Sequence, residues 1–259
     1  MLNEIQRYLP EHPWREHIHW FDTIDSTNTY AKQLAVAGAP EGTVVIADQQ
    51  TGGRGRLGRS FSSPSGMGIY LSVILRPNCR PEELMHLTCA AGVAAANAIG
   101  NPRIGIKWTN DLVLGKRKLG GILTELSVDS ATGTVAWAII GIGINCCQKP
   151  ADFPAEIRDI ACSLKMDEQD VPPLTAELIR KLYDMRQNLL TNKKGLMEEY
   201  TCRCITIGQS ISILQGNDVR HAVATGVDEN GGLTVCYRDG STETVTSGEV
   251  SIRGMYGYV

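Results

Sequence analysis

A short run of arginines and glycines, GRGRLGR at residues 53–59, concentrates cationic groups on a pliable segment. The guanidinium groups of Arg54, Arg56 and Arg59 can hold phosphate or carboxylate oxygens in a fixed planar geometry. The glycines between them let backbone N–H groups approach the same anion closely. The whole chain carries a formal net charge of −3, so this positive cluster is local. The segment therefore predicts a site for an anionic ligand, with a solvated surface loop as the plain alternative.

Three further segments place polar groups beside predicted strands. In KWTND at 107–111, an amide and a carboxylate follow a strand end, where they suit a phosphate, a ribose or Mg²⁺. In KRKLGGIL at 116–123, Lys118 stands as a compact cation at the mouth of an apolar strand. In GIGIN at 141–145, alternate glycines clear one face of a strand for a flat ligand. Taken singly, each segment also fits a plain structural role, namely a turn, a solvated lysine or close strand packing.

Two nucleotide-binding folds and a metal site fit the sequence poorly. Residues 53–60 nearly match the P-loop pattern, with Arg59 in the lysine position, but the SFSSPSGMG that follows cannot form the required helix. The GIG at 141–143 lacks the third glycine and the following helix of a dinucleotide fingerprint. The eight cysteines include no CxxC pair, so we expect reduced thiols and no protein-held metal.

Length and composition are those of an ordinary globular protein. The 259 residues are 42% hydrophobic and 20% charged, enough for a main domain and a small one. The N-terminal segment lacks the apolar stretch of a secretory signal, and no apolar run is long enough to span a bilayer. We therefore expect a cytoplasmic protein that does not enter a membrane. The sequence leaves the oligomeric state open, with a homodimer among the alternatives.

Hydrophobic periodicity predicts a region of mixed strands and helices followed by a β-rich end. Strands are expected at 18–21, 43–47, 69–75, 104–108, 112–114, 119–128 and 135–144. Helices are expected at 29–37 after the polar cap of 25–28, at 81–99, around 178–189 with Thr175 as cap, and at 195–200. After Cys204, short alternating runs separated by glycine turns predict a small SH3-like β-barrel. We therefore divide the chain into residues 1–205 and 206–259.

Taken together and in order, the motifs resemble those of the biotin protein ligases, the biotin–[acetyl-CoA-carboxylase] ligases. The resemblance covers nearly the whole chain and rests on STN at 26–28, Gln50 with GRGRLGR at 53–59, KWTND at 107–111, KRKLGGIL at 116–123 and GIGIN at 141–145. It implies an α+β fold with a mixed β-sheet flanked by helices, the class II synthetase-like catalytic fold of biotin–lipoate ligases. It also implies that biotin and MgATP give biotinyl-5′-AMP, from which a lysine of a biotin carboxyl carrier protein takes the biotin.

The resemblance implies roles for individual residues. The catalytic set that it implies is Lys118, Arg54 and Arg56, with Lys118 beside the biotin carboxylate and the α-phosphate. The implied biotin-binding set is Ser26, Thr27, Asn28, Gln50, Gly53, Arg54, Gly55, Arg56, Lys118, Gly121, Gly141 and Ile144. The implied nucleotide-binding set is Arg56, Arg59, Phe61, Asn110, Asp111, Lys118 and Asn145, with Mg²⁺ bound to ATP.

Two positions depart from the family pattern. Thr109 stands where proline is usual, and Phe61 stands where tryptophan is common. We expect Thr109 to loosen the turn before Asn110, and Phe61 to stack on adenine with less area. Only 25 residues precede Ser26, too few for the N-terminal DNA-binding domain of some family members. We therefore expect the form of the ligase that does not bind DNA.

Two other kinds of function stay open on the sequence. Lipoate–protein ligases and octanoyltransferases share the catalytic fold but lack the GRGRxGR segment. A ligand-sensing or nucleic-acid-binding module could also use the basic segment, although the net charge of −3 argues against nucleic acid.

Overall fold

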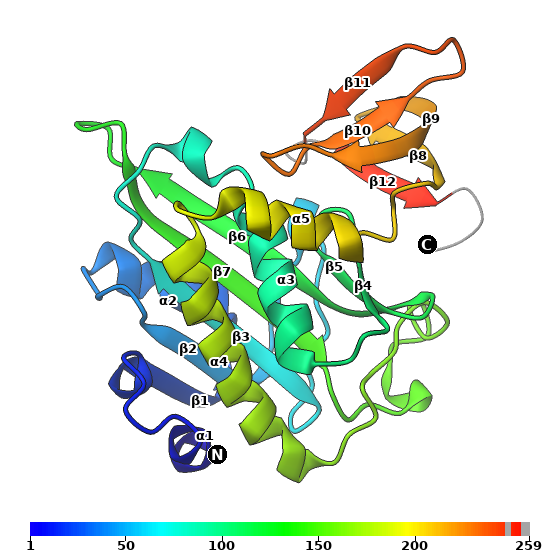
Figure 1. The fold of residues 1–259 in the computed structure, drawn as a ribbon. Helices are drawn as coiled ribbons and strands as arrows, with labels where there is room; N and C mark the ends of the chain where they lie inside the picture. The colour runs from blue at the N-terminus through cyan, green and yellow to red at the C-terminus, as the bar shows by residue number, and fades with distance from the viewer. Residues whose placement is uncertain (247–249, 255–259) are drawn as a thin grey trace.

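A seven-stranded mixed β-sheet forms the centre of the larger part of the chain (Figure 1). The structure is a computed structural model that describes residues 1–246 and 250–254. The strand order is β1-β2-β3-β7-β6-β5-β4, in which β1 and β2 are parallel and the other neighbours are antiparallel. The strands are β1 (Ile18–Ile24), β2 (Val44–Gln50), β3 (Gly68–Leu75), β4 (Ile104–Lys107), β5 (Asp111–Leu114), β6 (Arg117–Val128) and β7 (Val135–Asn145).

Helices cover the two faces of this sheet unequally (Figure 1). One face carries α1 (Leu2–Arg7), α3 (Leu87–Ile99), α4 (Val171–Asn188) and α5 (Lys193–Arg203). The other face carries α2 (Thr27–Val36), which packs Ala31 and Ala35 against β2, β3 and β7. Short 3₁₀ turns lie at Arg15–His17, Arg56–Gly58, Pro81–Leu84, Pro150–Asp152 and Glu168–Asp170.

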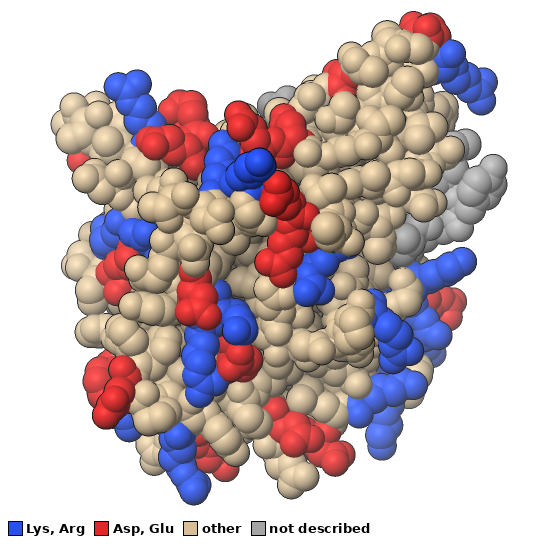
Figure 2. All heavy atoms as spheres, viewed as in Figure 1, with Lys and Arg blue, Asp and Glu red and all other residues tan. Residues whose placement is uncertain are grey.

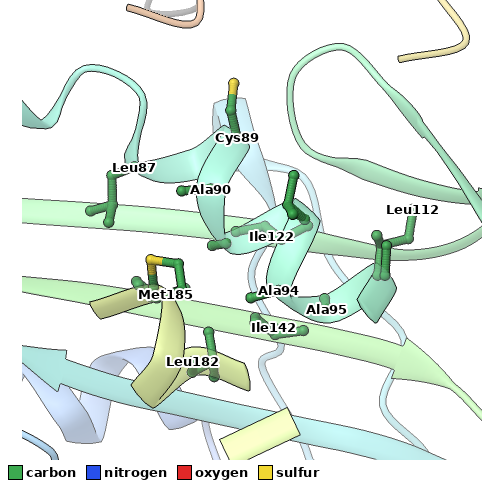
Figure 3. Packing of buried hydrophobic residues seen from close by; sticks show 14 of the residues in the cluster. Leu87, Cys89, Ala90, Ala94, Ala95, Leu112, Ile122, Ile142, Leu182 and Met185 are labelled. Atoms are coloured by element: carbon green, nitrogen blue, oxygen red, sulfur yellow. The ribbon is translucent and has the colours of Figure 1, made fainter. Parts of the chain in front are cut away.

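Successive side chains of strand β7 point alternately into the main core and toward the opposite face of the sheet. Ile140 and Ile142 belong to the main core, where Ile142 lies beneath α3, whose alanines let the helix lie close to the sheet (Figure 3). Gly141 and Gly143 face the α2 side, because a side chain at either position would collide with groups that lie there. The glycines predicted to clear one face of a strand therefore do so on the side away from the main core.

Two predicted helices differ from those observed, and one observed helix was not predicted. Helix α4 begins at Val171 with prolines in its first turn, so Thr175 lies inside it and donates to the Val171 carbonyl at 2.8 Å instead of capping it. The helix predicted at 81–99 is interrupted at His86, which is fully buried and bonds the Leu189 carbonyl at 2.9 Å. Helix α1 has only six residues, too few for a periodic pattern to reveal it.

The β-rich end forms a second, five-stranded antiparallel sheet in the order β11-β10-β9-β8-β12 (Figure 1). It contacts the rest of the chain at Trp108, whose backbone N–H donates to Thr206 Oγ1 and whose indole N–H donates to the Gly231 carbonyl, both at 2.9 Å. This sheet fits the predicted SH3-like end. Its strands are β8 (Ser210–Gln215), β9 (Asp218–Val227), β10 (Leu233–Cys236), β11 (Thr242–Val245) and β12 (Val250–Gly254).

The surface over the helices carries charges of both signs. Figure 2 shows acidic and basic side chains interspersed over most of this face, with several basic ones gathered at the lower right. Among residues 1–246 and 250–254, no helix is both long and apolar enough to cross a bilayer.

Candidate active site

A cavity opens on the sheet face that carries α2, between the start of that helix and residues 51–63, here called the arginine loop. The start of α2, the arginine loop, the β4–β5 connection and the facing parts of β6 and β7 build its walls. The lining residues are Ser26, Thr27, Asn28, Gln50, Arg54, Gly55, Arg56, Leu57, Arg59, Ser60, Phe61, Lys107, Trp108, Asn110, Asp111, Lys118, Gly121, Ile122, Leu123, Gly141, Ile142 and Gly143. All five sequence motifs therefore meet at one place.

The start of α2 supplies polar groups at one end of the cavity. Ser26 caps the helix, because its hydroxyl oxygen accepts from the Thr29 N–H at 3.5 Å, as the polar cluster predicts. Gln50 Oε1 accepts from the backbone N–H and the hydroxyl of Thr27 at 2.9 and 3.1 Å. The Gln50 amide nitrogen donates to Ser63 Oγ at 2.8 Å, which fixes the amide oxygen toward α2. Donors and acceptors are thus both at hand for a ring with C=O and N–H groups.

The arginine loop has a defined backbone shape. Isolated β-bridges pair Gln50 with Ser63 and Arg54 with Ser60, so the two sides of the loop run antiparallel. The Gly55 N–H donates to the carbonyl of Arg59 at 2.7 Å, which closes a tight turn at the tip. This turn places Arg54, Arg56 and Arg59 along one wall of the cavity.

Arg56 reaches from the loop to the β4–β5 connection. Its Nη1 donates to Thr109 Oγ1 at 2.9 Å and to Asn110 Oδ1 at 3.0 Å. Burial lowers the pKa of the Arg56 guanidinium, which still stays charged at neutral pH. The Tyr200 hydroxyl on α5 donates to the Thr109 carbonyl at 3.1 Å. The turn before Asn110 is therefore held at two points, one of which the Thr109 hydroxyl supplies.

Lys118 projects into the cavity beside Asp111. The two side chains form an ion pair with 2.6 Å between Nζ and Oδ1. The backbone of Lys118 is held on its outer side, where its N–H donates to the Ile160 carbonyl at 2.7 Å and its carbonyl accepts from the Cys162 N–H at 2.8 Å. A flanking segment thus fixes the strand start from which the ammonium group extends.

The cavity wall is strongly cationic, although the chain as a whole is slightly acidic. Five basic side chains line it against the single carboxylate of Asp111. Gly121, Gly141 and Gly143 line it without side chains of their own, and Asn28 and Phe61 lie against Gly141 and Gly143. Such a site suits an anionic ligand that has a flat, uncharged body.

Three residues of the predicted site lie outside the cavity lining. Gly53 is buried under the loop, where a side chain would collide with the Phe61 carbonyl and Ser63. Ile144 lies in the main core on the α3 side of β7, because it follows the alternation of Ile142. Asn145 donates to the Cys162 carbonyl at 3.0 Å and so supports the segment that flanks Lys118. Their expected contacts with a ligand stay a prediction.

The sequence interpretation also missed residues that line the cavity. Gly143, which the sequence predicts with Gly141 to clear one face of a strand, is absent only from the residue sets that the resemblance implies. Lys107 and Trp108 stand in the KWTND motif, but the start of the motif reads as a buried strand. Leu57 and Ser60 belong to the arginine loop, and their side-chain types carry no signal of ligand binding.

The cysteines stand apart from this chemistry. All eight are free thiols, and none lines the cavity. Burial raises the pKa of Cys89 and of Cys146 to about 12, so both remain protonated and unreactive at neutral pH.

Comparison with known proteins identifies the family. The sequence pattern of the Biotin/lipoate A/B protein ligase family matches residues 20–145, and that of the Biotin protein ligase C terminal domain matches residues 206–253. The chain is 36% identical over 248 residues to the bifunctional ligase/repressor BirA of Bacillus subtilis. This match covers 92% of this chain and 75% of that protein. The chain belongs to the biotin protein ligase family.

Other relatives agree with this assignment. The biotin–[acetyl-CoA-carboxylase] ligase of Mycobacterium tuberculosis is 29% identical to this ligase over 87% of this chain and 85% of that protein. The structure of a biotin protein ligase from Aquifex aeolicus in complex with biotin and ATP matches with a TM-score of 0.74 and 29% identity, over 92% of this chain and 98% of that one. The chain is an ATP-dependent biotin protein ligase, with the mixed sheet and the SH3-like end expected of that fold.

Proposed function

We propose that this ligase forms biotinyl-5′-AMP in the cavity and then passes biotin to a lysine of a biotin carboxyl carrier protein. In the first step a biotin carboxylate oxygen bonds to the α-phosphorus of ATP, and pyrophosphate leaves. In the second step the lysine amine bonds to the acyl carbon, and AMP leaves. Mg²⁺ takes part as MgATP, because phosphate oxygens suit this hard cation. The observation that carries the proposal is the meeting of STN, the arginine loop and Lys118 in one cationic cavity.

The polar end at α2 receives the ureido ring of biotin. That ring has one carbonyl acceptor and two N–H donors, so it needs both kinds of partner. Gly121 and Gly141 line the cavity, with the Asn28 side chain seated against Gly141, and both glycines are proposed to lie along the ring system. The residues proposed to contact the ureido group are Ser26, Thr27, Asn28 and Gln50.

The cationic end receives the two anions that react. A carboxylate and an α-phosphate repel each other, so the barrier falls when fixed positive charges surround the point where they meet. Arg54, Arg56 and Lys118, with the Gly55 backbone, are proposed to hold the acyl phosphate. The residues proposed for the nucleotide are Arg56, Arg59, Phe61, Asn110, Asp111 and Lys118.

The proposed domain boundary separates the two sheets. Residues 1–205 are proposed to form the catalytic domain and residues 206–259 the C-terminal domain, in line with the matches at 20–145 and 206–253. The net charge of −3 favours a protein partner over duplex DNA, so we propose that this chain does not bind DNA sequence-specifically.

Carrier labelling tests the proposal. A purified biotin carboxyl carrier domain is incubated with the chain, biotin and MgATP, and biotin is detected with streptavidin. We expect labelling that needs all three components and disappears when the carrier's acceptor lysine is replaced by arginine. Parallel reactions supply lipoate or octanoate in place of biotin. Transfer of either acid without transfer of biotin would overturn the proposal.

A further inference from the structure

A chain of hydrogen bonds runs from Glu125 on β6 to Thr27 in the cavity wall. Asn28 Nδ2 lies 3.0 Å from Glu125 Oε2 and 3.5 Å from the Leu123 carbonyl. Ser72 Oγ lies 2.6 Å from Asn28 Oδ1 and 2.8 Å from Thr27 Oγ1. Ser72 is fully buried, and neither it nor Glu125 lines the cavity. Two residues outside the site are thereby connected to two residues that form its wall.

Donor and acceptor chemistry fixes the direction of these bonds. Carboxylate and carbonyl oxygens only accept, so Asn28 turns its NH₂ group toward β6 and its oxygen toward Ser72. An amide oxygen also only accepts, so Ser72 gives its single hydrogen to Asn28. The Thr27 hydroxyl then has two acceptors within the protein, Ser72 Oγ and Gln50 Oε1, and its one hydrogen points to one of them. Toward the cavity, Thr27 presents a lone pair.

The neighbouring Ser26 has the opposite character. Its hydroxyl oxygen accepts the cap bond from the Thr29 N–H, and its hydroxyl hydrogen can be donated into the cavity. The α2 end therefore offers a ligand a donor at Ser26 and an acceptor at Thr27. This pair complements a ureido group, whose carbonyl accepts and whose N–H groups donate.

We propose that Glu125 and Ser72 are positioning residues that set this polarity and so make the site select ligands with a ureido N–H. The inference deepens the proposed function and rests on the cavity being a biotin site. Without the Glu125 carboxylate, only the longer bond to Leu123 holds the Asn28 amide, which can then turn over. A reversed amide donates to Ser72, and Ser72 then donates to Thr27. The Thr27 hydrogen then points to Gln50 Oε1, and the Ser72 hydrogen occupies a Thr27 lone pair that a ligand N–H would otherwise use.

The test measures biotin-dependent pyrophosphate release with biotin and with its ureido N-methyl derivatives, which lack one N–H. Glu125→Ala and Ser72→Ala should raise the KM for biotin about tenfold, the scale of one misdirected buried hydrogen bond. Their KM for ATP should stay within about twofold of the wild type. The ratio of kcat/KM for biotin to kcat/KM for the derivatives should fall by about the same factor as kcat/KM for biotin itself. Glu125→Gln can still turn an amide oxygen toward Asn28 and should keep most of the preference. Glu198→Ala, which removes an exposed carboxylate from α5, is the matched control and should behave as the wild type.

The change in preference separates positioning from a loss of shape. A merely distorted site would weaken biotin and its derivatives alike and leave their ratio unchanged. Thermal melting checks folding, and if Glu125→Ala does not fold, Ser72→Ala, which removes one oxygen atom, decides the matter alone. An unchanged ratio in folded variants would overturn the inference and leave the proposed function intact. A wild-type chain that releases no pyrophosphate with biotin would overturn the proposed function, and the inference with it.

Discussion

Replacing Lys118 by Gln should slow the formation of biotinyl-5′-AMP about a hundredfold. The ammonium group lies 2.6 Å from Asp111 Oδ1 at the cavity wall, with the Lys118 side chain 32% exposed. A charge pair about 4 Å apart is worth roughly 4 kcal/mol at an effective dielectric constant of about 20. Partial exposure screens this attraction, so the lower end of the roughly 10²- to 10³-fold loss found for one such stabiliser is expected.

Single-turnover pyrophosphate release with saturating biotin and MgATP measures this step without a carrier. Arg117→Gln is the matched control, because it removes the neighbouring cation, whose side chain is exposed and outside the cavity lining. The control should react within about twofold of the wild type, and both variants should melt as the wild type does. A folded Lys118→Gln protein that releases pyrophosphate at nearly the wild-type rate would refute the role of the lysine.

Three further perturbations have defined outcomes. Arg56→Gly removes the hydrogen bonds to Thr109 and Asn110, so we expect biotinyl-5′-AMP to form but to leave the cavity before transfer. A streptavidin blot should then show biotin on a bystander protein, and labelling of the carrier alone would contradict this. Gly141→Ala places a methyl group onto Asn28 Oδ1 and displaces that side chain, so the KM for biotin should rise at least about tenfold in the pyrophosphate assay. An unchanged KM would exclude Asn28 from biotin binding. Burial lowers the pKa of His86 below 6.5, so below pH 6.5 the unfolded chain binds more protons than the folded chain, and the stability that is complete above pH 6.5 declines under acid. Thermal melts from neutral pH to about pH 5 should show a shallower decline in melting temperature for His86→Gln than for the wild type. An identical decline would exclude His86 as a source of the acid sensitivity.

Local patterns predict the parts of this fold that depend on neighbouring residues. Strand β7 is evident from its apolar run, and the cap at Ser26 from the polar cluster before α2. The same two-residue period that exposes Gly141 to the cavity also places Ile144 in the core. The predicted biotin contact at Ile144 stays a prediction, since Ile142 on the same face of β7 does line the cavity.

Contacts between distant residues could not be predicted from the sequence. Gln50 meets Thr27 across 23 positions, and Asn28 meets Glu125 across 97. No periodicity links such pairs, because they depend on how β2, β3, β6 and β7 are ordered in the sheet. Thr109 gives a similar case, since its hydroxyl is useful only where Arg56 folds back onto the turn.

Identification of the compound held by the chain after reaction with biotin and MgATP, without any carrier, tests the central claim most directly. The chain is separated from small molecules, denatured, and its bound ligand is analysed by mass spectrometry. We expect biotinyl-5′-AMP in the wild type and its near absence at short reaction times in Lys118→Gln. Recovery of unreacted biotin alone, with ATP converted to ADP and phosphate, would contradict the account.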